Sequence, residues 1–138
     1  MDEYSMAEYI TTTFPGVETE TNFGYIFFFY GSDHTLPFAT LIAADNEYDR
    51  VSHLDRPGVF RLNIGVSRET FISLFGTTEV DAAAYDFAAL DVIMPHPEYA
   101  KQNFICVLSP SETTFERVRV LLAEAYDIGA RRFKRRNG

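Results

Sequence analysis

The sequence lacks most of the motifs that reveal a protein's chemistry. Its one cysteine, Cys106, lies among apolar neighbours and cannot form a disulfide bond within the chain. No glycine-rich phosphate loop, Gly-x-Ser-x-Gly motif or paired-cysteine motif is present. His53 and Asp55 offer only two metal ligands, whereas a zinc site needs three or four. We therefore expect no metal and no cofactor, and the sequence does not specify a reaction.

Long apolar segments are also lacking. The N-terminal residues are acidic and do not form the basic start and apolar core of a signal peptide. No apolar run approaches the length that spans a membrane. The sequence thus predicts a cytoplasmic protein without membrane partners.

Basic residues are scarce outside one segment. The chain has 138 residues, 46% of them hydrophobic, which suits one globular domain over residues 1–138. Its net charge is −8, and the resulting field repels phosphates, so nucleic-acid partners are not expected. Five of the 12 basic residues lie in a basic C-terminal tail, residues 131–138: Arg131, Arg132, Lys134, Arg135 and Arg136. Cations at the end of a helix also complement its dipole.

Hydrophobic periodicity predicts the secondary structure. A helix is expected over residues 3–13, where apolar residues recur at helical spacing before Pro15-Gly16. Aromatic, β-branched or alternating stretches predict four strands, at residues 24–30, 38–43, 59–66 and 103–108. The polar stretch 45–57 is expected to be a surface loop.

Capping residues define two further helices. Ser67 and Gly76 delimit a helix that ends at Phe75. Thr113 and Glu116 fit a capping box for a helix from about residue 114 to about residue 133. Segment 77–95 is ambiguous: its three alanines suggest a helical turn, and the rest is strand or irregular. The order α, β, β, β, α, β, α predicts an α+β domain with an antiparallel sheet and helices mainly on one face.

Several segments resemble an uncharacterised bacterial family, domain of unknown function 6194. The resemblance covers residues 23–130 and is carried by four segments: Pro37–Thr40, Leu54–Val66, Arg68–Phe71 and Asp91–Ala100. It brings no established activity, so no catalytic residue follows from it. More distantly, Arg61-Leu62-Asn63, the Asn103-Phe104-Ile105 segment and the closing basic helix are similar in order to the MmcQ/YjbR-like family. That similarity implies a YjbR-like two-layer fold, and DNA binding has been suggested for that family; this chain departs from it in its acidic body and in segment 77–95.

The best site candidates lie at the strand expected over residues 59–66. Alternation places Arg61 and Asn63 on one face, which meets water or a ligand, and an arginine fork there suits a carboxylate or a phosphate. Asp55 and Arg56 precede this strand in a turn, where they serve turn structure or a site.

His96 is the best acid–base candidate, because it lies between two prolines and can change charge near neutral pH. A structural role at a helix start is an equal alternative. Tyr99 follows it closely. We expect these two residues to meet Asp55, Arg56, Arg61 and Asn63 around one shallow ligand pocket.

These observations favour a module that binds a small ligand or a protein partner and has no established activity. One alternative is a small enzyme in which His96 acts as acid or base and Arg61 holds an anion. Another is a nucleic-acid binder that uses the basic tail.

Overall fold

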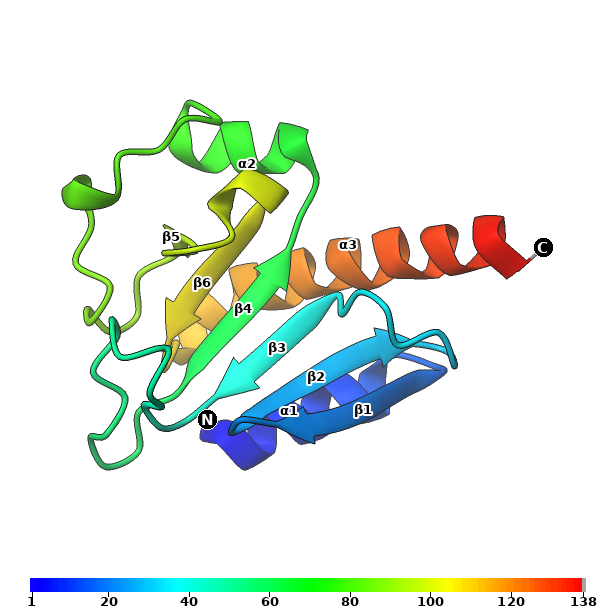
Figure 1. Ribbon diagram of the computed structural model, residues 1–138, viewed down its shortest axis with the longest axis horizontal. Helices are drawn as coiled ribbons and strands as arrows, with labels where there is room; N and C mark the ends of the chain where they lie inside the picture. The colour runs from blue at the N-terminus through cyan, green and yellow to red at the C-terminus, as the bar shows by residue number, and fades with distance from the viewer. Residues whose placement is uncertain (138) are drawn as a thin grey trace.

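A computed structural model describes residues 1–137 and contains three α-helices and a six-stranded antiparallel sheet (Figure 1). The helices are α1 (Glu3–Thr13), α2 (Arg68–Phe75) and α3 (Glu112–Asn137), with 3₁₀ turns η1 (Ala82–Ala84) and η2 (Ala100–Gln102). The strands are β1 (Val17–Asn22), β2 (Tyr25–Tyr30), β3 (Ala39–Ile42), β4 (Arg61–Gly65), β5 (Met94–Pro95) and β6 (Phe104–Leu108), in the order β1-β2-β3-β4-β6-β5. The predicted α+β class is confirmed.

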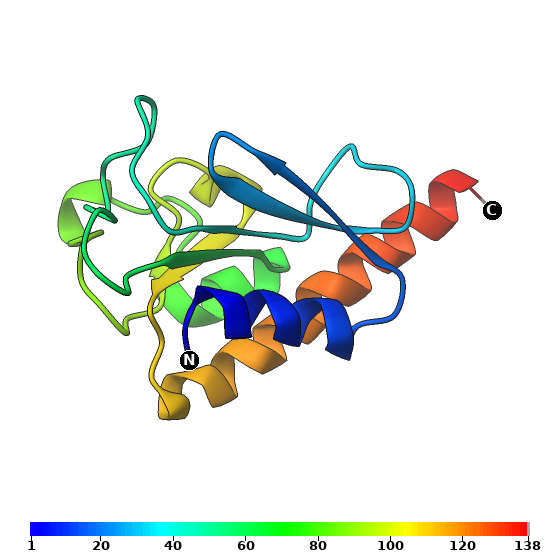
Figure 2. The same cartoon turned by 90° about the horizontal axis from the view of Figure 1, so that it is seen from below.

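The main core lies between the sheet and the helices. Helices α1 and α3 cover the same side of the sheet, and the loop after β3 rises on the other side (Figure 2). Alternate residues of β4 supply this core: Leu62 and Ile64 are fully buried there. Leu122 of α3, also fully buried, meets the same cluster. The predicted apolar stripe of the last helix therefore covers the sheet, as expected.

Strand β1 was not predicted from the sequence. Five of its six residues are exposed, because it is an edge strand and carries glutamate and threonine instead of an apolar alternation. It pairs with β2 through a tight turn in which Phe23 and Gly24 both have positive φ, 54° and 82°. A strand of this composition resembles a loop when only its own residues are considered.

The helix ends agree in part with the predicted caps. Ser67 caps α2 and Gly76 ends it in a left-handed conformation, as predicted. The cap predicted for α3 is wrong: the Ser111 hydroxyl, not Thr113, accepts the N–H of Thr114, at 3.2 Å. The helix begins at Glu112 and continues to Asn137, so residues 131–137 form its last turns and not a separate tail.

Segment 77–95 forms η1, irregular chain and β5, which pairs with β6. Together with loop 45–57 it covers part of the sheet on the side away from α1 and α3. A second small core lies there, and it includes Leu54, Phe87 and Met94. Among residues 1–137, no helix has the combination of length and apolarity needed to cross a membrane.

Candidate functional site

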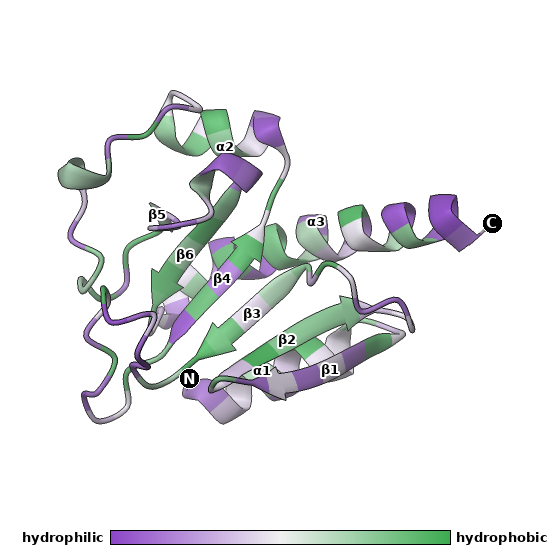
Figure 3. Cartoon of the chain, viewed as in Figure 1, coloured by the Kyte–Doolittle hydropathy of each residue, from purple (hydrophilic) through white to green (hydrophobic). Residues whose placement is uncertain are grey.

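The polar residues of β4 lie on the side of the sheet opposite to the main core. Figure 3 shows a hydrophilic stretch at the start of β4 within an otherwise largely hydrophobic part of the sheet. Asn63 pairs with Thr40 of β3, and Arg61 pairs with Ile42. Arg61 is 0% exposed and Asn63 is 1% exposed. This face was predicted to meet water or a ligand. The water alternative is wrong, because loop 45–57 folds over Arg61 and Asn63.

Arg61 is fully engaged by protein acceptors. Its Nη1 and Nη2 atoms lie 3.2 Å and 2.5 Å from the two carboxylate oxygens of Asp49, a bidentate ion pair. Its Nη1 also donates to Ser52 Oγ at 3.0 Å, and its Nε donates to Asn63 Oδ1 at 3.0 Å. The guanidinium thus attaches the loop to the sheet.

Two neighbouring side chains complete this buried network. Asn63 Nδ2 donates to Thr40 Oγ1 at 2.9 Å, and the Tyr25 hydroxyl donates to the Asp49 carboxylate. Burial favours the neutral form of Asp49, but hydrogen bonds from Arg61 and Tyr25 and the Arg61 charge outweigh it and lower the Asp49 pKa. Burial and the Asp49 carboxylate raise the pKa of Tyr25. At neutral pH the network therefore contains one carboxylate, one guanidinium and a neutral phenol.

His96 extends the β5–β6 pairing, because its N–H donates to the Phe104 carbonyl at 2.9 Å. Its Nδ1 accepts two main-chain N–H groups, from Glu98 at 3.0 Å and from Tyr99 at 2.9 Å. An atom that accepts two N–H groups carries no proton, so the ring proton is on Nε2. Burial, reinforced by the Arg61 charge, lowers the pKa of His96 to about 3. The imidazole is therefore neutral at physiological pH.

The Nε2 atom of His96 has no hydrogen-bond partner among residues 1–137. Every buried side-chain nitrogen or oxygen in this part of the chain does have a partner, so Nε2 must contact solvent although the residue is only 5% exposed. The Tyr99 ring lies beside it, with ring centroids 5.0 Å apart, and is half exposed. A single N–H donor with slight exposure to solvent thus lies next to an accessible aromatic ring.

Asp55 and Arg56 have roles within the loop. Asp55 Oδ1 accepts the N–H of Asp45 at 3.0 Å. Arg56 donates to the carbonyls of His53, Ser52 and Ala88, at 2.7 to 3.0 Å, which ties the loop to segment 77–95.

Arg56 also lines a hollow of about 200 Å³ between the start of α1 and the turn before β4. Asp2, another polar residue of that hollow, already caps α1. The structure brings Arg61 together with Asn63, and His96 together with Tyr99. Among the described residues, neither Asp55 nor Arg56 hydrogen-bonds to the side chain of any of these four.

Sequence reasoning missed the partners of Arg61. The loop contains four acidic residues, Asp45, Glu47, Asp49 and Asp55, and nothing in the sequence distinguishes the carboxylate that reaches the sheet. Tyr25 lies in the aromatic stretch that predicts a strand over residues 24–30, and that pattern gives no sign of a polar role for its hydroxyl. A buried arginine is usually paired with a carboxylate, but alternation alone did not show that Arg61 is buried.

A second polar cluster lies at the β1 edge of the sheet. The two ring nitrogens of His34 lie 2.9 Å from Glu18 and 3.2 Å from Glu20, and the ring stacks on Phe29 with centroids 4.4 Å apart. The hydrogen bond with Glu20 has the largest effect on the pKa of His34 and raises it. Burial opposes this shift, but the hydrogen bond with Glu18 and the two carboxylate charges add to it, so the pKa is raised. Within residues 1–137 no group of three or more His, Cys, Asp or Glu side chains is arranged to hold a metal ion.

Comparisons with known proteins identify a family but no function. The model of one family, described as "Family of unknown function (DUF6194)", matches residues 1–138. No curated protein matches the sequence. No solved structure matches it either.

Proposed function

The chain therefore belongs to this family of unknown function, and from the geometry of its site we propose that it is a small-ligand binding module in which His96 donates a hydrogen bond to the ligand. The observation that carries the proposal is the state of the His96 ring. Two main-chain N–H groups hold Nδ1 as an acceptor, which leaves Nε2–H as a donor without a partner among residues 1–137. A donor held in one orientation loses little freedom when it binds, which favours affinity.

The surroundings of His96 indicate the chemistry of the ligand. Nε2–H requires an acceptor, such as a carbonyl or carboxylate oxygen. The exposed Tyr99 ring offers an apolar face to a planar group. The nearby charge of Arg61 is balanced by Asp49, so the site does not require an anion. We therefore propose a planar ligand with a carbonyl or carboxylate group.

The enzyme alternative is less well supported. A general acid or base works best when its pKa is near the operating pH, and the His96 pKa of about 3 is far below it. Arg61 is fully buried and paired with Asp49, so holding a substrate anion would require breaking that ion pair.

The nucleic-acid alternative depends on the basic end of α3 alone. The body of the protein is acidic, and its field opposes a polyanion. We predict no binding of DNA or RNA at physiological salt; a sub-micromolar, salt-sensitive affinity in a mobility-shift assay would contradict this. The distant YjbR-like similarity and the cytoplasmic location stay predictions.

The proposal can be tested with benzamide, benzoate and benzylamine, which share a ring but differ in the group it carries. Benzamide and benzoate offer an acceptor oxygen, whereas benzylammonium offers only donors. We expect the first two, at millimolar concentration, to raise the melting temperature and to shift the His96 Nε2–H resonance in NMR spectra. Benzylamine should do neither.

His96→Asn is the informative variant. The asparagine Oδ1 can replace Nδ1 as the acceptor of the two main-chain N–H groups, while the Nε2–H donor is lost. The variant should fold and no longer bind benzamide. His53→Asn is a matched control, because His53 lies in loop 45–57 at φ 50°, a conformation that asparagine tolerates. If His96→Asn binds benzamide as well as the parent protein does, or if benzylamine binds equally well, the proposal is wrong.

A further inference from the structure

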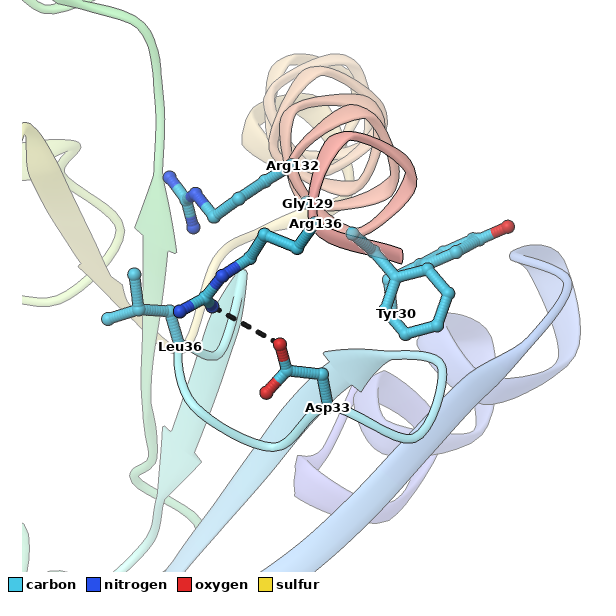
Figure 4. Close-up of a pocket in the computed structure, with 7 residues that line it drawn as sticks. Tyr30, Asp33, Leu36, Gly129, Arg132 and Arg136 are labelled. Carbon is cyan, nitrogen blue, oxygen red and sulfur yellow. Dashed lines mark hydrogen bonds and ion pairs between the residues drawn. The ribbon is translucent and has the colours of Figure 1, made fainter. Parts of the chain in front are cut away.

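A small hollow lies between the end of α3 and the loop that joins β2 to β3 (Figure 4). The rings of Tyr30 and Phe133, with centroids 5.4 Å apart, form one side of it. Leu36, which is 55% exposed, lies on another side. Arg132 and Arg136 extend from α3 toward this space. Two cations thus approach one hollow whose other walls are the Asp33 carboxylate and the apolar or aromatic side chains of Leu36, Tyr30 and Phe133.

The charges at this hollow are not balanced within the chain. Arg136 Nη1 lies 3.2 Å from Asp33 Oδ2. Arg132 has no ion pair and no hydrogen bond to any side chain in residues 1–137. Arg131, its neighbour in sequence, differs, because it pairs with Asp127 at 3.0 Å. Like charges one helical turn apart repel each other, so Arg132 and Arg136 together favour an anion that both can contact.

The size of the hollow limits what can enter it. Its volume of about 20 Å³ accommodates one water-sized atom and not a whole ligand. One oxygen of a tetrahedral oxyanion can enter while the other oxygens meet the guanidinium N–H groups outside. A planar guanidinium binds two oxygens of such a group at once. A phosphate monoester carries a charge close to −2 at neutral pH, which matches two arginines.

We propose that Arg132 and Arg136 form a binding site for the phosphoryl group of a small phosphorylated molecule, separate from the His96 site. Asp33 acts as an internal competitor, because its carboxylate occupies Arg136 in the free protein. Its release is not costly, since the Thr35 hydroxyl also donates to the Asp33 carboxylate and remains in place. Phosphate then takes the position of Asp33 on Arg136 and recruits Arg132.

The test is a titration of the full chain with inorganic phosphate, followed by NMR, at pH 7.5 and at an ionic strength held constant with sodium chloride. We expect saturable shifts confined to the amides of residues 31–36 and 129–136, with a dissociation constant in the millimolar range. Arg132→Gln should weaken binding by about tenfold or more, the effect of losing a charged hydrogen-bond donor. Asp33→Asn should strengthen binding, because it removes the competitor.

Arg131→Gln is the matched control. It removes the same charge from the adjacent position, but its partner is Asp127, and it should change the dissociation constant by less than about twofold. Circular dichroism shows whether each variant retains its helix content. If Arg132→Gln loses helix content, Arg132→Lys replaces it, because lysine keeps the positive charge but lacks the planar guanidinium. Equal effects of Arg131→Gln and Arg132→Gln, shifts that do not saturate, or unchanged affinity in Asp33→Asn would each overturn the proposal.

Discussion

Replacing Arg61 with methionine tests whether the buried ion pair stabilises the fold. Methionine fills much of the volume of the arginine stem but supplies no donor. The variant leaves the Asp49 carboxylate, whose side chain is 10% exposed, without its cation. Ser52 Oγ and Asn63 Oδ1 also lose the Arg61 N–H groups that donate to them. We expect a strongly destabilised but folded protein.

The magnitude follows from the contacts that are lost. Breaking a buried ion pair by removing one partner typically costs about 3–5 kcal/mol, because the other charge remains buried without compensation. Arg61 makes four side-chain hydrogen bonds, two of them to a carboxylate. Hydrogen bonds to charged groups contribute about 1.5–3 kcal/mol each, but such contributions are not additive within one network. We therefore expect a loss of about 3–5 kcal/mol in the free energy of unfolding.

The assay is urea denaturation followed by far-UV circular dichroism, at pH 7 and at lower pH. In the parent protein the Asp49 pKa is below its usual value of 3.8, so the ionised carboxylate stabilises the fold above pH 3.8, and this contribution is lost as the pH falls through the lower folded pKa. In Arg61→Met, burial raises the pKa of the same carboxyl, so protonation at low pH relieves the penalty. The difference between the two proteins should therefore shrink as the pH falls from 7 toward 4.

Arg119→Met is the control for this experiment. Arg119 pairs with Glu116 at 2.9 Å, but both side chains are more than half exposed. Exposed pairs contribute about 0–1 kcal/mol, so this variant should lose little stability at any pH. Two results would show that the buried pair does not hold loop 45–57 to the sheet. One is a loss of unfolding free energy in Arg61→Met no larger than that in Arg119→Met. The other is a loss in Arg61→Met that stays the same at every pH.

Four further predictions concern other residues. In an NMR titration His96 should stay neutral from pH 4 to 8, because its pKa is about 3. His34 should titrate above 6.5 because of its two glutamate partners, so their contribution to stability is present below pH 6.5 and is lost as the pH rises through the raised pKa; a value at or below 6.5 would contradict the cluster. Leu122→Ala should cost about 2–5 kcal/mol in denaturation experiments, and a loss under about 0.5 kcal/mol would place this residue outside the core. Ser111→Ala should cost about 0.5–2 kcal/mol and Thr113→Ala much less; the reverse order would restore the cap predicted from the sequence.

The sequence was sufficient for elements whose signals are local. The span of α1 follows from the helical spacing of its apolar residues, and α2 follows from Ser67 and Gly76. The alternation around Leu62 and Ile64 correctly separated the core face of β4 from its polar face. Strand β1 was not predicted, because an edge strand does not need an apolar face and its residues lack the alternation on which strand prediction depends.

The candidate site could be predicted only in part, because its contacts join segments that are distant in the sequence. Sequence reasoning selected Arg61, Asn63 and His96 as notable residues, since their types and positions are unusual beside apolar strands. It left open whether Arg61 meets water or holds a ligand, whereas the structure pairs its guanidinium with Asp49. It also placed His96 near its ordinary pKa, where it could act as acid or base. Burial and the nearby guanidinium remove that ability.

The sequence by itself determined the fold class, the helix-bearing face of the sheet and the residue types available for binding. These properties depend on spacing along the chain, because helices and strands place side chains with fixed periods. Only the tertiary structure decided that Asp49 partners Arg61, that loop 45–57 covers the polar face, and that the free donor of His96 is Nε2. These properties depend on contacts between segments that are distant in the sequence, and on the burial that those contacts produce.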